Sequence, residues 1–131
     1  MAFKYNSVLV VDDNPIDVLI HKKLLEKSGL AKNVCTTTSA KSGLELIENL
    51  IEMGQEELIP HYVFLDIDMP LTNGFQFLKK MDEMGISNKI IKGVIILSAG
   101  GYNVDREELK ESDLFLDFIQ KPLLAEHLVD L

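Results

Sequence analysis

Acidic side chains directly follow two apolar runs of the sequence. Asp12 and Asp13 come after VLVV, and Asp66 comes after YVFL, with Asp68 two residues further on. Carboxylates held close together repel one another, which raises the pKa of at least one of them unless a cation is present. Mg²⁺ prefers oxygen ligands and keeps several waters, and an aspartate beside it can act as a nucleophile towards phosphorus. If the fold brings these acids together, they predict a magnesium site capable of phosphoryl chemistry.

Two further apolar runs end in groups that could balance the charge of a phosphate. Ser98 follows VIIL and is itself followed by the small residue Ala99, and Lys121 follows the run that ends at Ile119 and Gln120. A hydroxyl and nearby backbone N–H groups can donate hydrogen bonds to phosphoryl oxygens, and an ammonium can offset their charge. Asp12 or Asp13 alone could be a helix-flanking acid, Ser98 a turn residue and Lys121 a solvated lysine, whereas Asp66 at the end of a buried run has no obvious capping role. Their joint occurrence at the ends of four runs indicates a functional site.

These side chains can meet only if the apolar runs are parallel strands whose carboxyl ends share one edge of a sheet. The runs are short and rich in β-branched residues, which is typical of strands covered on both faces. The expected strands are residues 7–11, 34–38, 62–65, 94–97 and 114–119. Stretches with helical spacing separate them, so the chain predicts a doubly wound three-layer α/β fold with five parallel strands in the order 2-1-3-4-5 and five helices.

The expected helices differ in how firmly they should be held. Three of them carry apolar stripes: Ile16, Leu19, Ile20 and Leu24; Leu44, Ile47 and Ile51; and Phe75, Leu78 and Met81. Asn14 should cap the first helix, with Pro15 at its first position and Gly29 beyond its end. Residues 104–112, with only Val104 and Leu109 as apolar anchors, should form a short and weakly held helix. Residues 124–131 should form a final helix of about two turns.

Composition limits the class of protein and its partners. The chain has 131 residues, 47% hydrophobic and 26% charged, which fits one globular domain. A net charge of −8 should repel nucleic acids and anionic membranes. No run is long enough to span a membrane, and the N-terminus lacks the pattern of a secretory signal. We therefore expect a cytoplasmic protein with neither nucleic-acid nor membrane partners, and the three histidines to be surface or structural residues.

Four motifs resemble those of the receiver domain of two-component response regulators, close to the single-domain, CheY-like type. They are VLVVDDNP, FLDIDMPLTNG, ILSAGG and FIQKPL, and they occur in the order of the family across essentially the whole chain. The resemblance implies a single receiver domain over residues 1–131 with no output domain. Such a protein is a phosphoacceptor in signalling, with self-catalysed phosphorylation and dephosphorylation, and is not otherwise an enzyme.

The resemblance also implies roles for the acids. Asp66 would be the phosphoacceptor. Asp12, Asp13 and Asp66 would bind Mg²⁺ together with the backbone carbonyl of Asp68. The phosphoryl group would come from a histidine kinase or a phosphotransfer protein.

For the remaining site residues, the resemblance implies contacts with the phosphoryl group and a switch. Ser98, Ala99 and Lys121 would bind that group, and Pro122 would follow a cis peptide bond. Phe118 would be the switch aromatic, although a core ring explains it equally well. Phosphorylation would draw Ser98 towards the new charge and turn Phe118 inward. This would alter the face formed by residues 104–112, 114–119 and 124–131, and with it the affinity for a downstream target protein.

Other classes of protein share single features of this sequence. The Asp-x-Asp of FLDIDMP also occurs in aspartate phosphohydrolases of the haloacid-dehalogenase type, in which the second aspartate is a general acid/base. That class usually continues with Gly-Thr, whereas Met-Pro follows here. A flavin carrier would need a hydroxyl-rich phosphate loop in place of DDNP. A receiver that serves only for docking would not need the full set of site residues that is present.

Overall fold

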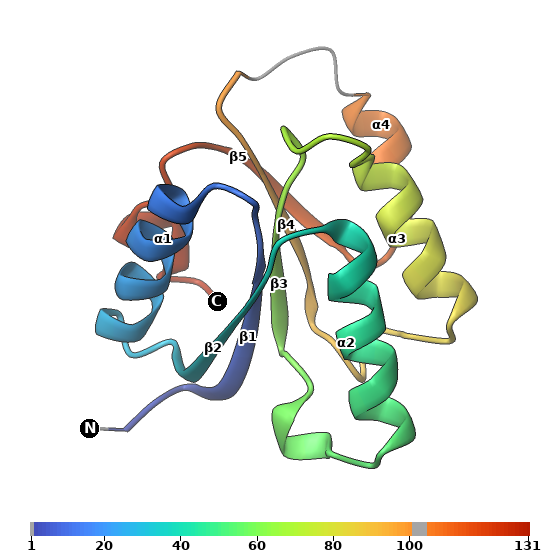
Figure 1. The fold of residues 1–131 in the computed structure, drawn as a ribbon, viewed down its shortest axis with the longest axis horizontal. Coiled ribbons are helices and arrows are strands. Elements are labelled where there is room, and N and C mark those ends of the chain that lie inside the picture. The colour runs from blue at the N-terminus through green and yellow to red at the C-terminus, as the bar shows by residue number, and fades with distance from the viewer. Residues whose placement is uncertain (1, 101–104) are drawn as a thin grey trace.

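The structure, a computed structural model, describes residues 2–100 and 105–131 and alternates strands with helices (Figure 1). The strands are β1 (Tyr5–Val11), β2 (Ala31–Thr37), β3 (Tyr62–Asp66), β4 (Gly93–Ser98) and β5 (Phe115–Gln120). The α-helices are α1 (Pro15–Lys27), α2 (Ala40–Glu52), α3 (Gly74–Glu83) and α4 (Arg106–Leu109). Two 3₁₀ helices, η1 (Glu56–Leu58) and η2 (Ala125–Leu128), complete the described elements.

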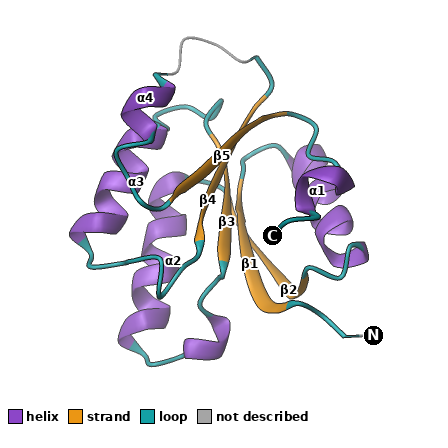
Figure 2. Ribbon diagram, turned by 180° about the vertical axis from the view of Figure 1, so that it is seen from behind, coloured by secondary structure: helices purple, strands orange, loops and turns teal. Residues whose placement is uncertain are grey.

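The strands form one parallel sheet in the order β2-β1-β3-β4-β5, which confirms the predicted topology. Helix α1 and the C-terminal segment cover one face, and α2, α3 and α4 cover the other (Figure 1; Figure 2). Each predicted strand is present, with its ends moved by up to three residues. Asp66 is the last residue of β3 and Ser98 the last of β4.

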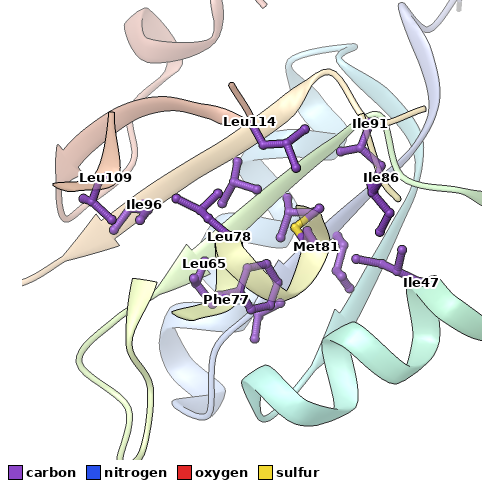
Figure 3. Packing of buried hydrophobic residues seen from close by; sticks show 14 of the residues in the cluster. Ile47, Leu65, Phe77, Leu78, Met81, Ile86, Ile91, Ile96, Leu109 and Leu114 are labelled. Carbon is purple, nitrogen blue, oxygen red and sulfur yellow. The ribbon is translucent and has the colours of Figure 1, made fainter. Parts of the chain in front are cut away.

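Alternating side chains of β1 fill the two halves of the core. Leu9 and Val11 join the larger cluster beneath α2 and α3, which includes Leu78 and Met81 (Figure 3). Val8 and Val10 join the smaller cluster beneath α1 and η2. Because successive strand residues point to opposite faces, a strand buried on both sides must be apolar throughout. This explains why the strands appear in the sequence as unbroken apolar runs.

Helix α1 is present, but its predicted apolar stripe is wrong for three of its four residues, since only Leu24 packs, partly buried, against the smaller core cluster. Asn14 caps it by accepting hydrogen bonds from the N–H groups of residues 16 and 17, and Pro15 is its first residue, as expected. Ile16, Leu19 and Ile20, however, are 69%, 53% and 49% exposed.

The sheet-facing side of α1 is formed by other residues of the same helix. Its buried side chains are His21 and Leu25. Apolar residues lie on two opposite sides of this helix. Val18 and Leu25, about two turns apart, share one side, and Ile16 and Ile20, about one turn apart, share the other. Periodicity alone therefore did not determine which side packs on the sheet. Because the buried side carries the polar His21, the opposite side has the more hydrophobic sequence pattern.

The predicted C-terminal helix is also wrong, and the described residues contain four α-helices where five were expected. Residues 125–128 form the 3₁₀ helix η2, and both Leu123 and Leu128 are buried in the smaller cluster. The Leu124 N–H donates to Nδ1 of His127 at 2.9 Å, which closes a tight turn. So short a segment has little intrinsic helical stability, and side-chain burial decides its shape.

Helix α4 has only one turn, in keeping with the weakly held helix expected in this region. Its residue Leu109 is buried as the predicted anchor, whereas the other predicted anchor, Val104, lies outside the described residues. Within the described ranges, no helix is both long and apolar enough to cross a bilayer.

Candidate functional site

The predicted site residues gather at the carboxyl edge of the sheet, and backbone hydrogen bonds between neighbouring strands continue right up to them. The Asp12 N–H donates to the Thr37 carbonyl at 3.0 Å. The N–H of Ile67, which follows Asp66, donates to the Leu97 carbonyl at 3.1 Å. The Lys121 N–H donates to the carbonyl of Ser98 at 2.8 Å. The ladder of the sheet thus sets the backbone positions of the site.

Three acids from two strand ends form one cluster. Asp12, Asp13 and Asp66 each present a carboxylate oxygen within 4.8 Å of the others. Asp12 and Asp66 are only 1% and 3% exposed, whereas Asp13 is exposed to solvent. One oxygen of Asp12 accepts the N–H of Asn14 at 2.9 Å, and one oxygen of Asp66 accepts the N–H of Asp68 at 2.8 Å. The prediction that β1 and β3 bring these acids together is confirmed.

Lys121 supplies the positive charge that faces this cluster. Its Nζ lies 3.2 Å from a carboxylate oxygen of Asp12 and 3.0 Å from one of Asp66. The burial of Lys121 lowers its pKa, but hydrogen bonds to Asp17 and Asp66 and the charges of Asp66 and Asp12 outweigh burial, so the net shift is upward. The ammonium therefore remains charged across the physiological pH range.

Burial is the main cause that raises the pKa of Asp12 above its usual value. The neighbouring Asp66 charge acts in the same direction, while the Asn14 N–H and Lys121 oppose it. A buried carboxyl beside another carboxylate disfavours its own charged form, and a cation relieves that cost. The donor set at this point consists of carboxylate oxygens, which are the ligands that Mg²⁺ prefers. The cluster therefore fits the predicted ion.

Asp17 is a member of the site that was not predicted from the sequence. Its carboxylate lies 2.9 Å from Nζ of Lys121. Three carboxylates, those of Asp12, Asp17 and Asp66, thus share one ammonium. Asp17 follows Asp13 by about one helical turn, and this spacing was the feature of the sequence that could have placed Asp17 near the site.

The side chain of Asp68 joins the end of β4. One of its oxygens accepts a hydrogen bond from the Ser98 hydroxyl at 2.9 Å, and the other accepts the Ala99 N–H at 2.6 Å. Ser98 is 1% exposed, whereas Asp68 and Ala99 lie at the surface. The structure thus brings Ser98 and Ala99 to the site, but both donate to a carboxylate that follows the phosphoacceptor candidate by two residues. The resemblance assigned a metal-ligand role to the backbone carbonyl of Asp68, and these contacts of its side chain with Ser98 and Ala99 were not predicted.

Two further predicted residues lie on or just after β5. Phe118 is half-buried against the larger core cluster, and the guanidinium carbon of Arg106 in α4 lies 4.5 Å from the centre of its ring. This contact connects the one-turn helix α4 with the central part of β5. The peptide bond between Lys121 and Pro122 is cis, as the resemblance implied.

The chain belongs to the family of response regulator receiver domains, which matches residues 8–131. It is 35% identical over 125 residues to two-component response regulator 24 of Arabidopsis thaliana, covering 95% of this chain and 80% of that protein. Other curated relatives are much longer, and the chain spans as little as 6% of one of them. Fold, acidic cluster and lysine thus belong to a receiver domain of two-component signalling.

Solved structures have the same CheY-like fold. A two-component response regulator from Cytophaga hutchinsonii aligns with a TM-score of 0.81 at 23% identity, over 97% of this chain and 93% of that one. The receiver domain of the Arabidopsis thaliana histidine kinase CKI1, complexed with Mg²⁺ and BeF₃⁻, aligns with a TM-score of 0.69 at 27% identity. That alignment covers 86% of this chain and 80% of the CKI1 domain.

Proposed function

We propose that this chain is a phosphoacceptor that takes a phosphoryl group on Asp66 from a histidine kinase or a phosphotransfer protein, in the cytoplasm and in the presence of Mg²⁺. The observation that carries the proposal is the buried Asp66 carboxylate, which lies within 4.8 Å of Asp12 and Asp13 and 3.0 Å from Lys121. The CKI1 receiver domain with its Mg²⁺ and BeF₃⁻ supports it by analogy. The net charge of −8 should repel nucleic acids, so the proposed partners are proteins.

The residues of the cluster divide the work between charge balance and nucleophilic attack. Asp12, Asp13 and Asp66 would hold Mg²⁺ with the backbone carbonyl of Asp68, and the ion would supply positive charge next to the incoming phosphoryl oxygens. An oxygen of Asp66 forms the new bond to phosphorus as the bond from phosphorus to the donor histidine nitrogen breaks, and the electron pair returns to the imidazole. Lys121 stays protonated throughout and offsets the added negative charge.

The binding role extends to Ser98 and Ala99. Their O–H and N–H groups lie at the end of β4, next to Asp66 at the end of β3, since Asp66 and Leu97 are paired in the sheet. In the proposal they donate hydrogen bonds to the phosphoryl oxygens once Asp66 is modified. Movement towards that group would be transmitted to Phe118 and α4, because Arg106 contacts the Phe118 ring. The surface of α4, β5 and η2 is then the proposed site for a downstream protein.

A phosphohydrolase of the haloacid-dehalogenase type is less consistent with these contacts. It would use Asp68 as a general acid/base within reach of the substrate. Both carboxylate oxygens of Asp68 instead accept hydrogen bonds, from Ser98 and Ala99. Membership of the receiver family also favours a phosphoacceptor over a hydrolase that turns over added substrates.

Intact-mass measurement after incubation with acetyl phosphate and Mg²⁺ tests this function. We expect the wild-type chain to gain one labile phosphoryl group and the Asp66→Asn variant to gain none, because an amide cannot form the acyl phosphate. Asp82→Asn is the matched control, since Asp82 is an exposed carboxylate of α3, remote from the cluster in the sequence. It should be labelled like the wild type. Labelling of Asp66→Asn to the wild-type extent, or turnover of added phosphomonoesters without labelling, would contradict the proposal.

A further inference from the structure

Asp68 places a carboxylate where a phosphoryl group on Asp66 would need its hydrogen-bond donors. Its two oxygens accept from the Ser98 hydroxyl at 2.9 Å and from the Ala99 N–H at 2.6 Å. The contacts span 30 and 31 residues of sequence, so they join the loop after β3 to the end of β4. These are the donors that the proposed function assigns to the phosphoryl oxygens. The Ser98 hydroxyl and the Ala99 N–H cannot donate full hydrogen bonds to a carboxylate and to a phosphoryl group at the same time.

We propose that Asp68 is a positioning residue that competes with the phosphoryl group for Ser98 and Ala99, and so sets how readily the modified state forms. The proposal rests on the proposed function, because it concerns the same pocket. In the unmodified protein the Asp68 carboxylate holds both donors. In the modified protein the phosphoryl oxygens take them, and the Asp68 side chain leaves.

Charge makes the exchange one-sided once Asp66 is modified. Asp12, Asp17 and Asp66 already share the single ammonium of Lys121. A phosphoryl group adds further negative charge beside Asp68, and like charges at short range repel. A phosphoryl group also offers three acceptor oxygens, and hydrogen bonds to such a group are charge-assisted. The phosphoryl group is therefore the stronger competitor, but it must first displace Asp68.

The location of Asp68 allows it to leave without a change of fold. Its side chain is exposed, so rotation about its own bonds can move the carboxylate into water. Its backbone N–H separately donates to Asp66 at 2.8 Å and can stay in place while the side chain rotates. Ser98, by contrast, is 1% exposed and belongs to β4. The moving part of the exchange is thus one surface side chain.

Binding of BeF₃⁻ in the presence of Mg²⁺ tests the competition, because this anion binds a carboxylate as a tetrahedral analogue of a phosphoryl group. Its affinity can be measured on the full chain by ¹⁹F NMR titration. Asp68→Ala removes both acceptors and should tighten binding about tenfold, the effect expected for freeing donors from a charged acceptor. Asp68→Asn removes the charge but keeps an acceptor for one donor, so its gain should be smaller. Asp82→Asn, an exposed carboxylate removed elsewhere, should bind like the wild type.

A double-mutant cycle with Ser98→Ala separates competition for donors from simple charge repulsion. If Asp68 acts by holding Ser98, the gain from Asp68→Ala should fall to about threefold in the Ser98→Ala background, where only the Ala99 N–H is contested. Equal affinities of wild type and Asp68→Ala would overturn the inference, as would an undiminished gain in the Ser98→Ala background. Thermal unfolding monitored by circular dichroism confirms that each variant is folded before titration.

The same titration distinguishes failure of the inference from failure of the proposed function. Wild-type binding that is lost in Asp66→Asn supports the phosphoacceptor site, whatever Asp68 does. Absence of BeF₃⁻ binding in the wild type and in Asp68→Ala would instead contradict the function itself. Binding that appears only after Asp68 is replaced would support both, because it would mean that Asp68 blocks the pocket.

Discussion

Helices α1 and α3 lie on opposite faces of the same sheet and are held by different means. Helix α3 buries Phe77, Leu78 and Met81 in the larger core cluster. Helix α1 buries only His21 and Leu25 and leaves the apolar side chains of residues 16, 19 and 20 in solvent. Helix α3 is thus held on the sheet mainly by hydrophobic contacts, and α1 buries fewer apolar side chains.

Polar contacts take a larger part in holding α1. Asn14 caps its first turn, and Asp17 forms an ion pair with Lys121 of the site at 2.9 Å. The Leu123 N–H lies 3.5 Å from Nε2 of the buried His21. Helix α1 is therefore coupled to the site by charge, whereas α3 is coupled to the core by volume. Changes in pH or in the charge of the site should affect α1 first.

The largest expected effect is on the α3 side. Leu78 is fully buried, so Leu78→Ala leaves a cavity beneath the sheet. It should lower the free energy of unfolding by about 2–5 kcal/mol, measured by urea denaturation at neutral pH. A loss below about 1 kcal/mol would mean that α3 is not the main hydrophobic support and would remove the contrast between the two helices.

An intermediate and pH-dependent effect is expected at His21. Burial lowers its pKa below 6.5, the Lys121 charge acts in the same direction, and Asp17 and Asp66 oppose it. Below pH 6.5 the unfolded chain therefore binds a proton that the folded chain resists, so the stability that His21 contributes is lost as the pH falls through this region. The free energy of unfolding of the wild type should drop more than that of His21→Gln between about pH 7.5 and 5.5.

Urea denaturation of both proteins at each pH measures this difference. All other ionisable groups are common to the two proteins, so a difference between their pH dependences is assigned to residue 21. A wild type and a His21→Gln variant with the same pH dependence would show that the α1 side does not respond to protonation at this position.

The smallest expected effect comes from the same substitution chemistry on the exposed side of α1. Leu19 is 53% exposed, so Leu19→Ala removes little buried surface. It should change the free energy of unfolding by less than about 0.5 kcal/mol, in contrast to Leu78→Ala. A cost comparable to that of Leu78→Ala would indicate that another molecule covers this side of α1 in solution. Sedimentation of the wild-type chain at increasing concentrations would detect such self-association.

Spacing and polarity in the sequence sufficed to predict the sheet and most of the site. The apolar runs end in Asp12, Asp66 and Ser98 and just before Lys121. These residues could be predicted to meet because parallel strands share one carboxyl edge. The side of α1 could not be predicted, since apolar residues occur on two sides of that helix and only packing selects between them. The C-terminal 3₁₀ helix depends on burial of Leu128, which local propensity does not register.

The missed contacts of the site have a common cause. Asp17 reaches Lys121, and the Asp68 side chain reaches Ser98, across 104 and 30 residues of sequence. Such contacts depend on the directions of side chains after the elements have packed, and residue spacing within a motif does not contain that information. The acids of the cluster were easier to predict because they follow directly from strand ends.

The backbone bonds that extend the sheet ladder to Asp12, Ile67 and Lys121 have a mechanical consequence. Opening any of them would separate residues at the ends of strands whose side chains form the core, so the backbone at Asp12, Ile67 and Lys121 is tied to the core. Asp68 and Ala99 lie just beyond this stiff frame. A partner that binds the loops after β3 and β4 would therefore shift Asp68 and Ala99, and with them the affinity of the pocket for a phosphoryl group, while the backbone that carries Asp12 and Lys121 stays in place.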